Sequence, residues 1–197
     1  MNKSEIKYIQ FNTIFHPYTA KLFVDAFRTI HDSNQAIIPI EINSPGGYVW
    51  GLETMLDCVD TSEKPVACFC TGWAASCAAA LAMSCTDGLR FCGPNLEFMI
   101  HQVAGGSSGK AADMEADSIV VNKLLDKYVY SRCDKAAKKE PGYTKGLIKD
   151  NFNADLTMFA DEAIAHGFFD EIGTINMLKD MDYLISKCDP NKIIKKR

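Results

Sequence analysis

The chain has 197 residues, of which 47% are hydrophobic and 23% are charged, and its formal net charge is -4. The weakly acidic balance argues against nucleic acid as a main partner. No apolar run approaches the roughly 18 residues that a membrane-spanning helix needs. We therefore expect one globular domain over residues 1–197, with neither nucleic acid nor a membrane as its partner.

The N-terminus and the cysteines indicate the compartment. Residues 1–5 lead into a strand pattern and not into the apolar core of a signal peptide, which predicts a cytoplasmic protein. None of the eight cysteines forms a CxxC pair or a His/Cys cluster with zinc spacing. Cys68, Cys70 and Cys77 lie among apolar or small residues, so we expect reduced, structural thiols. We expect neither a metal nor a cofactor.

Short apolar strands alternate with amphipathic helices in the first half of the chain. Strands are predicted at residues 6–11, 36–42, 65–70, 89–92 and 97–101, and helices at residues 17–30, 49–59 and 74–83. The first helix carries Leu22, Phe23, Ala26, Phe27 and Ile30 on one side. Because the connections are brief and the strands mostly apolar, the pattern is typical of repeated βαβ units around a buried parallel sheet.

The second half has a different character. A glycine–serine segment at residues 103–110 precedes a long helical stretch from residue 111 to about residue 138. Its apolar stripe consists of Met114, Ile119, Leu124, Leu125, Tyr128 and Val129. The many charges favour a helix that projects and offers this stripe to a partner, and packing on its own sheet is the alternative. Residues 144–149 and 161–166 predict shorter helices, the second capped by Asp161 and ended by Gly167, and residues 168–172 predict a last strand.

Ser76 stands between a predicted strand and an alanine-rich helix. At a helix N-terminus, free backbone N–H groups and the helix dipole favour developing negative charge. His101 ends an apolar strand, and Gly46 and Gly47 form a loop that can bring backbone N–H groups close to a substrate. Alone, the serine is more simply an N-cap and the histidine a core residue. Together they supply a nucleophile, a base and oxyanion donors.

These residues resemble the ClpP family of serine peptidases. The matching segments are residues 42–47, 72–76, 90–95, 99–102 and the glycines of 105–109, with a closing pattern at Ala160, Glu162, Ala163, Gly167 and Asp170. Their order and spacing agree over about residues 36–173, which leaves 174–197 as a C-terminal tail. The resemblance implies an α/β fold of the ClpP/crotonase-like type with a projecting helical handle. It also implies a Ser-His-Asp triad that contains Ser76 as nucleophile and His101 as base.

Two aspartates compete for the third position of the triad. Counting forward from His101 slightly favours Asp150, whereas counting back from the closing pattern favours Asp155. We choose Asp155, because residues 138–143 tolerate an insertion and the closing pattern has no room for one. The resemblance further implies that the backbone N–H groups of Gly47 and Cys77 form the oxyanion hole.

The resemblance also implies an assembly and its partners. In the family, homo-oligomeric rings of seven subunits stack in pairs, and an AAA+ unfoldase feeds them peptides or unfolded chains. The positions that form the unfoldase docking pocket read Pro39, Glu41, Thr61 and Thr71 here, with Phe91 retained. A charged Glu41 opposes docking of an apolar anchor. Ala154 stands where the family has an arginine that helps rings pair, so both unfoldase docking and ring stacking stay open.

The interpretation is a serine endopeptidase, and three alternatives accompany it. A catalytically silent structural subunit is disfavoured by the complete set of Ser76, His101 and Asp155. A crotonase-type acyl-CoA enzyme is disfavoured by the serine–histidine pair and by the lack of an obvious patch for the CoA phosphates. A Ser-Lys peptidase needs a lysine in the matched segments, and none there suggests itself.

Overall fold

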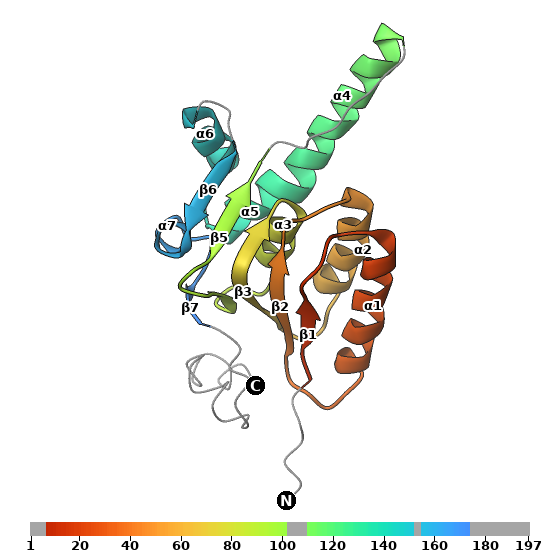
Figure 1. The fold of residues 1–197 in the computed structure, drawn as a ribbon, viewed down its shortest axis with the longest axis vertical. Helices are drawn as coiled ribbons and strands as arrows, with labels where there is room; N and C mark the ends of the chain where they lie inside the picture. The colour runs from red at the N-terminus through yellow and green to blue at the C-terminus, as the bar shows by residue number, and fades with distance from the viewer. Residues whose placement is uncertain (1–6, 102–109, 152–154, 174–197) are drawn as a thin grey trace, which may run out of the picture.

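The computed structural model describes residues 7–101, 110–151 and 155–173 (Figure 1). In chain order the elements are β1 (Ile9–Phe11), α1 (Pro17–His31), β2 (Ile38–Ser44), α2 (Val49–Asp60), β3 (Val66–Ala75), α3 (Cys77–Met83), β4 (Arg90–Cys92), β5 (Glu97–Ile100), α4 (Ala111–Leu125), the π-helix η1 (Asp126–Tyr130), α5 (Ser131–Ala136), α6 (Tyr143–Asp150), β6 (Leu156–Phe159), α7 (Ala160–Ala165) and β7 (Glu171–Ile172).

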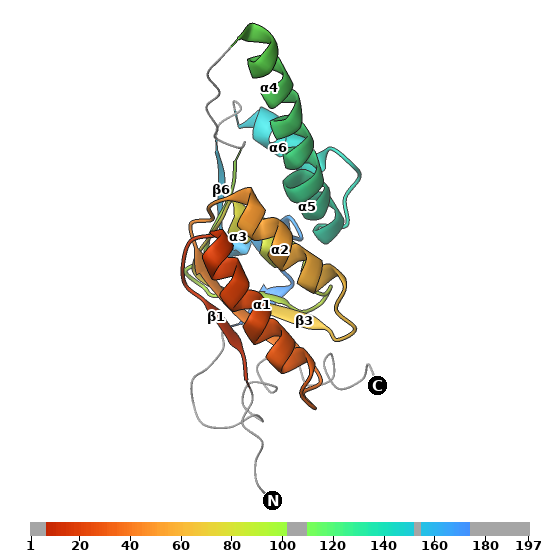
Figure 2. The same cartoon turned by 90° about the vertical axis from the view of Figure 1, so that its right-hand side faces the viewer.

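The described strands form one seven-stranded sheet in the order β1-β2-β3-β4-β7, with β5 pairing to β3 and β6 pairing to β5. All pairs are parallel except β5–β6, which is antiparallel. Helices α1 and α2 lie side by side on one face of the sheet (Figures 1 and 2). The predicted α/β fold is confirmed. The antiparallel strand was not predicted, because nothing in residues 156–159 distinguishes the direction of pairing.

Helix α1 begins with a reciprocal cap. The Nδ1 atom of His16 accepts from the Tyr18 amide at 3.2 Å, the Thr19 hydroxyl accepts from the His16 amide at 3.0 Å, and Pro17 is the first helical residue. The buried face consists of Ala20, Phe23, Val24, Phe27 and Ile30. The prediction for Leu22 was wrong: it is 51% exposed. Val24, two residues further along the helix, lies on the buried face instead.

Strand β3 is longer, and helix α3 shorter, than predicted. Ala74 and Ala75 continue the strand and pair with Phe98 and Met99 of β5, so the helix begins at Cys77 and not at residue 74. Alanine fits either conformation, and the tertiary pairing decides between them. As a result, Ser76 lies at the junction of strand and helix and not inside the first helical turn.

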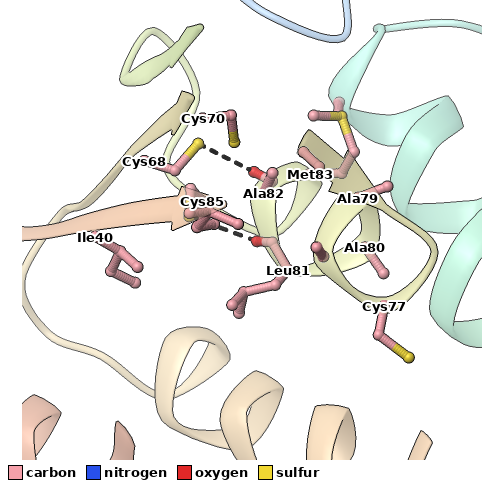
Figure 3. Close-up of a cluster of buried hydrophobic side chains, with 14 of the residues drawn as sticks. Ile40, Cys68, Cys70, Cys77, Ala79, Ala80, Leu81, Ala82, Met83 and Cys85 are labelled. Carbon is pink, nitrogen blue, oxygen red and sulfur yellow. Dashed lines mark hydrogen bonds between the residues drawn. The ribbon is translucent and has the colours of Figure 1, made fainter. Parts of the chain in front are cut away.

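All residues of α3 are buried, and the helix packs on β3. Figure 3 shows Cys68 and Cys70 of β3 close to Cys85, where the Cys68 thiol lies 3.6 Å from the Ala82 carbonyl and the Cys85 thiol 3.5 Å from the Leu81 carbonyl. The seven cysteines of the described residues are free thiols, as predicted, and six of them are buried. The eighth, Cys188, lies outside the described residues.

Arg90 is a fully buried charged residue that connects β4 to Asp170, just before β7. It is 2% exposed, its guanidinium donates to Asp170 at 3.1 and 3.3 Å, and its amide donates to the same carboxylate at 2.9 Å. A further contact of 3.1 Å reaches Asp87. A buried guanidinium needs such partners, so Arg90 fixes the return of the chain into β7 beside β4.

Helices α4, η1 and α5 form one long projecting rod, and only its base packs on the core (Figures 1 and 2). Near the tip Met114 is 46% and Ile119 51% exposed, whereas Leu125 and Val129 are buried at the base. The two interpretations of the stripe therefore apply to different parts of the helix. At its base the apolar residues pack on the core of the same subunit, and further out they are exposed.

The last helix differs from prediction at its start. Phe159 is the N-cap of α7, and Asp161 lies in the first turn, where its negative charge interacts favourably with the helix dipole. The Glu162 side chain accepts a hydrogen bond from the Phe159 amide at 2.9 Å and caps the helix in place of Asp161. Gly167 follows the helix with a φ of +85°, as predicted for its end. Among the described helices none is long and apolar enough to cross a membrane.

Candidate active site

The strands bring the candidate residues to one edge of the sheet. Ser76 directly follows β3 and His101 directly follows β5, and these two strands are parallel neighbours with Ala75 opposite Met99. The loop of Gly46 and Gly47 follows β2 on the other side of β3. Parallel strands place their carboxyl ends together, which is where α/β proteins build their sites.

Ser76 has a strained backbone conformation, with φ 58° and ψ -118°. Apart from Lys138, it is the only non-glycine residue of the described part with a positive φ. Its amide donates to the Met99 carbonyl at 2.9 Å, and its carbonyl accepts from the Ala80 amide at 3.2 Å. Such a conformation costs on the order of 1–3 kcal/mol and persists only where the surroundings enforce it. Here β5 and the first turn of α3 enforce it, and the hydroxyl projects from the strand–helix turn.

His101 meets Ser76 directly. The Nε2 atom of the ring lies 2.8 Å from the Ser76 hydroxyl oxygen, and this contact is partly buried. The same strand that anchors the Ser76 amide through Met99 also positions His101 two residues later. The structure thus brings together the nucleophile and the base that the sequence predicted, within hydrogen-bond distance.

The glycine loop lies against the serine turn so closely that side chains are excluded. A Cβ added to Gly46 would be 2.7 Å from the Ser76 Cβ and 3.0 Å from the Cys77 amide nitrogen. A Cβ added to Gly47 would be 2.4 Å from the Phe15 carbonyl oxygen. Within the described ranges, neither the Gly47 nor the Cys77 amide donates to another backbone group. Both predicted donors therefore lie beside Ser76 with their N–H groups free of backbone partners.

Asp155 is positioned by the antiparallel pair β5–β6. The register sets Ile100 opposite Leu156. Its continuation by one residue beyond the paired segment would set His101 opposite Asp155, a position where side chains are usually about 5 Å apart. Asp155 is exposed, and no hydrogen bond joins its carboxylate to His101 in the described part of the chain. Its carbonyl accepts from the Asn151 side chain at 3.0 Å. Asp150, the competing candidate, is the last residue of α6 and has no such register with β5.

The Cys77 side chain was not predicted to contribute, yet its thiol donates to the Gly47 carbonyl at 3.2 Å. Burial raises the pKa of this thiol to about 11, while the Gly47 backbone and the Ser76 hydroxyl act in the opposite direction. A protonated thiol is a donor and a poor nucleophile. One usable signal for a side chain at the site was present in the sequence, since Cys77 follows Ser76 directly.

Two further features next to the site were missed. The Asn43 side chain accepts from the Trp73 amide at 3.1 Å and so ties the end of β2 to β3. Tyr48, the residue after Gly47, stacks on Trp50 with ring centres 6.4 Å apart, and the two rings are 56% and 70% exposed. The sequence pattern placed Trp50 in the predicted helix at residues 49–59 and gave no role to Tyr48.

No group of three or more His, Cys, Asp or Glu side chains suited to a metal ion occurs in the part of the chain that the structure describes. A serine on a strained strand–helix turn, opposite a histidine, is the arrangement of serine hydrolases on α/β folds.

Comparisons with known proteins agree with this class. The Clp protease family matches residues 7–176. ATP-dependent Clp protease proteolytic subunit 2 of Bacillus licheniformis is 34% identical over 144 residues, which are 72% of this chain and 72% of the relative. The ATP-dependent Clp protease proteolytic subunit of Streptococcus pyogenes serotype M5 is 34% identical over 158 residues, covering 80% of this chain and 76% of the relative.

Among solved structures, a mutant of ClpP1 from Listeria monocytogenes superposes with a TM-score of 0.74 at 22% identity, over 90% of this chain and 94% of that one. At this identity the structural likeness shows the fold alone. The family match and the two sequence relatives show more: this chain belongs to the Clp protease family.

Proposed function

We propose that this chain is a serine endopeptidase whose nucleophile is Ser76, whose general base is His101 and whose third triad member is Asp155. The observation that carries the proposal is the distance of 2.8 Å between the Ser76 hydroxyl and the His101 Nε2 atom, at the adjoining ends of two parallel strands. Membership of the Clp protease family supports the same activity.

The proposed reaction is acyl transfer from a peptide to serine and then to water. His101 takes the proton of the Ser76 hydroxyl as its oxygen attacks the peptide carbonyl, and later gives a proton to the leaving amine. The amides of Gly47 and Cys77 stabilise the oxyanion. Asp155 holds the tautomer of His101 and stabilises the imidazolium. Water then attacks the acyl-enzyme, with His101 again acting as base.

Asp155 is not hydrogen-bonded to His101 among the described residues, so its role requires a small adjustment. Directly opposed residues of an antiparallel pair are close enough for a side-chain rotation to join them. We propose that this rotation accompanies assembly or substrate binding. Catalytic hydrogen bonds often tighten only in the complex.

We further propose a ring-shaped homo-oligomer that encloses the sites and cleaves peptides or unfolded chains in the cytoplasm. The exposed apolar residues Met114, Ile119 and Val120 on the projecting α4 support a contact with another copy. The residues at the docking positions for an AAA+ unfoldase are unfavourable for an apolar anchor. Glu41 accepts from Gln10 at 3.0 Å and faces Thr71 at 3.5 Å, which makes that patch of the sheet polar. Ala154 lies outside the described residues.

Two of the alternative functions can be distinguished from a peptidase by the behaviour of Ser76. A silent structural subunit would form rings without reacting at Ser76. A crotonase-type enzyme would use the Gly47 and Cys77 amides without needing the serine. The contact between Ser76 and His101 favours the peptidase over both.

A fluorophosphonate probe tests the proposal, because it reacts covalently with an activated serine. We expect labelling of the wild-type oligomer, loss of labelling in Ser76→Ala, and loss of at least about 100-fold in His101→Ala. Hydrolysis of a fluorogenic peptide should fall in parallel.

Native mass is measured on each variant, so that failure to assemble is separated from failure of chemistry. Ser84→Ala is the matched control, because Ser84 ends the same helix and its hydroxyl donates to the Ala80 carbonyl at 2.7 Å, away from the site. Well-formed wild-type rings that do not react would contradict the proposal and favour the structural subunit.

A further inference from the structure

The thiol of Cys77 lies between the two halves of the candidate oxyanion hole. It is 4% exposed, and it reaches from the first residue of α3 to the Gly47 carbonyl on the glycine loop at 3.2 Å. Figure 3 shows its sulfur directed away from the Cys68, Cys70 and Cys85 group at the other side of α3. This thiol is therefore not part of that core cluster and has a separate environment beside Ser76.

The contact is a hydrogen bond between the glycine loop and the first residue of α3. Gly47 is tied on its far side to the segment before α1, where the Gly46 carbonyl accepts from the Phe15 amide and the Phe15 carbonyl accepts from the Tyr48 amide, both at 2.8 Å. Toward the serine, the described hydrogen bond between Gly47 and the α3 turn is the one from Cys77. Gly47 has a φ of +145°, a conformation that glycine leaves easily. The Gly47 carbonyl belongs to the Gly47–Tyr48 peptide and the Gly47 N–H to the Gly46–Gly47 peptide, so the thiol acts on the N–H through the position of the whole loop.

We propose that Cys77 is a positioning residue, whose thiol ties the glycine loop to the serine turn through the Gly47 carbonyl and so keeps the Gly47 N–H beside the oxyanion. The inference rests on the proposed function and deepens it, since it assigns a role to a side chain where only the backbone amide was expected to act. The thiol stays protonated at neutral pH and so remains a donor to the carbonyl. It does not compete with Ser76 as a nucleophile.

The experiment compares three replacements at this one position. Cys77→Ser keeps a donor, Cys77→Ala removes it with volume, and Cys77→Val removes it while nearly keeping volume. Each is assayed for the second-order rate of fluorophosphonate labelling and for kcat and KM on a fluorogenic peptide. Cys58→Ala, which removes a thiol that lies on α2, is the matched control. Native mass and the urea midpoint show that each variant folds and assembles.

We expect labelling and kcat to fall about 10-fold in both Cys77→Ala and Cys77→Val, since complete loss of an oxyanion donor costs about 10²–10³ and a displaced one costs part of that. KM should stay within about 2-fold, and Cys77→Ser within about 3-fold of wild type in every parameter. Equal rates in all variants, a Ser variant as slow as the Ala variant, or a faster Ala variant would each overturn the inference. An unreactive wild type would instead overturn the proposed function itself.

Discussion

Ile100 and Leu156 face each other across the antiparallel pair of β5 and β6. Continuing this register by one residue beyond the two strands would set His101 opposite Asp155. The relationship depends on backbone pairing and not on any side-chain contact. It favours Asp155 as the proposed third triad member, because Asp150 lies at the end of α6, outside the sheet.

The first prediction concerns these two aspartates. Asp155→Asn should lower kcat by about 10³–10⁴, because the His101 tautomer is then no longer held. Asp150→Asn should stay within about 2-fold of wild type. Steady-state peptide hydrolysis measures both. A large loss in the Asp150 variant with an active Asp155 variant would reverse the assignment.

The second prediction concerns the glycine loop. Gly47→Ala should reduce labelling by at least about 100-fold, since the added methyl collides with the Phe15 carbonyl at 2.4 Å and displaces an oxyanion amide. Gly88→Ala is the matched control: it also has a positive φ, but its Cβ would meet nothing within 4 Å. Both variants lose backbone freedom, so only the first should lose reactivity. Equal losses would mean that backbone strain alone is responsible.

The third prediction concerns the buried Arg90. Asp170→Asn removes the charge that receives three of its hydrogen bonds and should lower the free energy of unfolding by about 3 kcal/mol. Asp87→Asn should cost under about 1 kcal/mol, because that side chain is 60% exposed. Urea unfolding of each variant gives the two values. A similar cost for both would show that Arg90 shares its charge evenly between them.

The fourth prediction is a loss of stability in alkali. Burial raises the pKa of Cys77 to about 11 and that of Cys92 to about 12, from an ordinary value of 9.0. Above pH 9 the unfolded chain therefore releases protons that the folded chain keeps. The stabilisation is complete below pH 9 and declines as the pH rises through 11 and 12, by up to about 1.4 kcal/mol per pH unit for each thiol.

Urea unfolding at pH 8, 9 and 10 measures this decline, and the double variant Cys77→Ser, Cys92→Ser is the comparison. Its slope above pH 9 should be shallower, because serine does not titrate there. An unchanged slope would assign the alkaline loss to other groups.

The fifth prediction concerns the projecting α4. Ile119 and Val120 are 51% and 53% exposed, so replacing both by serine should change the free energy of unfolding of the subunit by less than about 0.5 kcal/mol. If α4 joins two rings, the native mass should fall to that of one ring. An unchanged mass would place the contact between rings elsewhere.

The alternation of strands and helices was predictable because burial on a parallel sheet leaves a strong apolar pattern. The proximity of Ser76 and His101 was predictable, because each directly follows a strand of the same parallel sheet; their catalytic roles stay predictions. The antiparallel β6 and the long β3 were not predictable, since Ala74 and Ala75 fit a helix as well as a strand and tertiary pairing decided. Leu22 was assigned to the buried face as one of several apolar residues in the helix, whereas Val24, two residues further on, lies on that face. The role proposed for Cys77 needs a contact between segments 30 residues apart, and spacing alone does not reveal it. The single-domain expectation and the cytoplasmic location stay predictions.

The π-helix η1 has a consequence for where the projecting rod points. One turn of wider winding between α4 and α5 inserts a residue into the helical count, and each residue of an α-helix corresponds to about 100° of rotation. Deleting one residue of Asp126–Tyr130 would restore an unbroken α-helix and would rotate everything beyond it by about that angle, with the base unmoved. The direction in which Ile119 and Val120 face, relative to the base of the rod, thus depends on a single residue in η1.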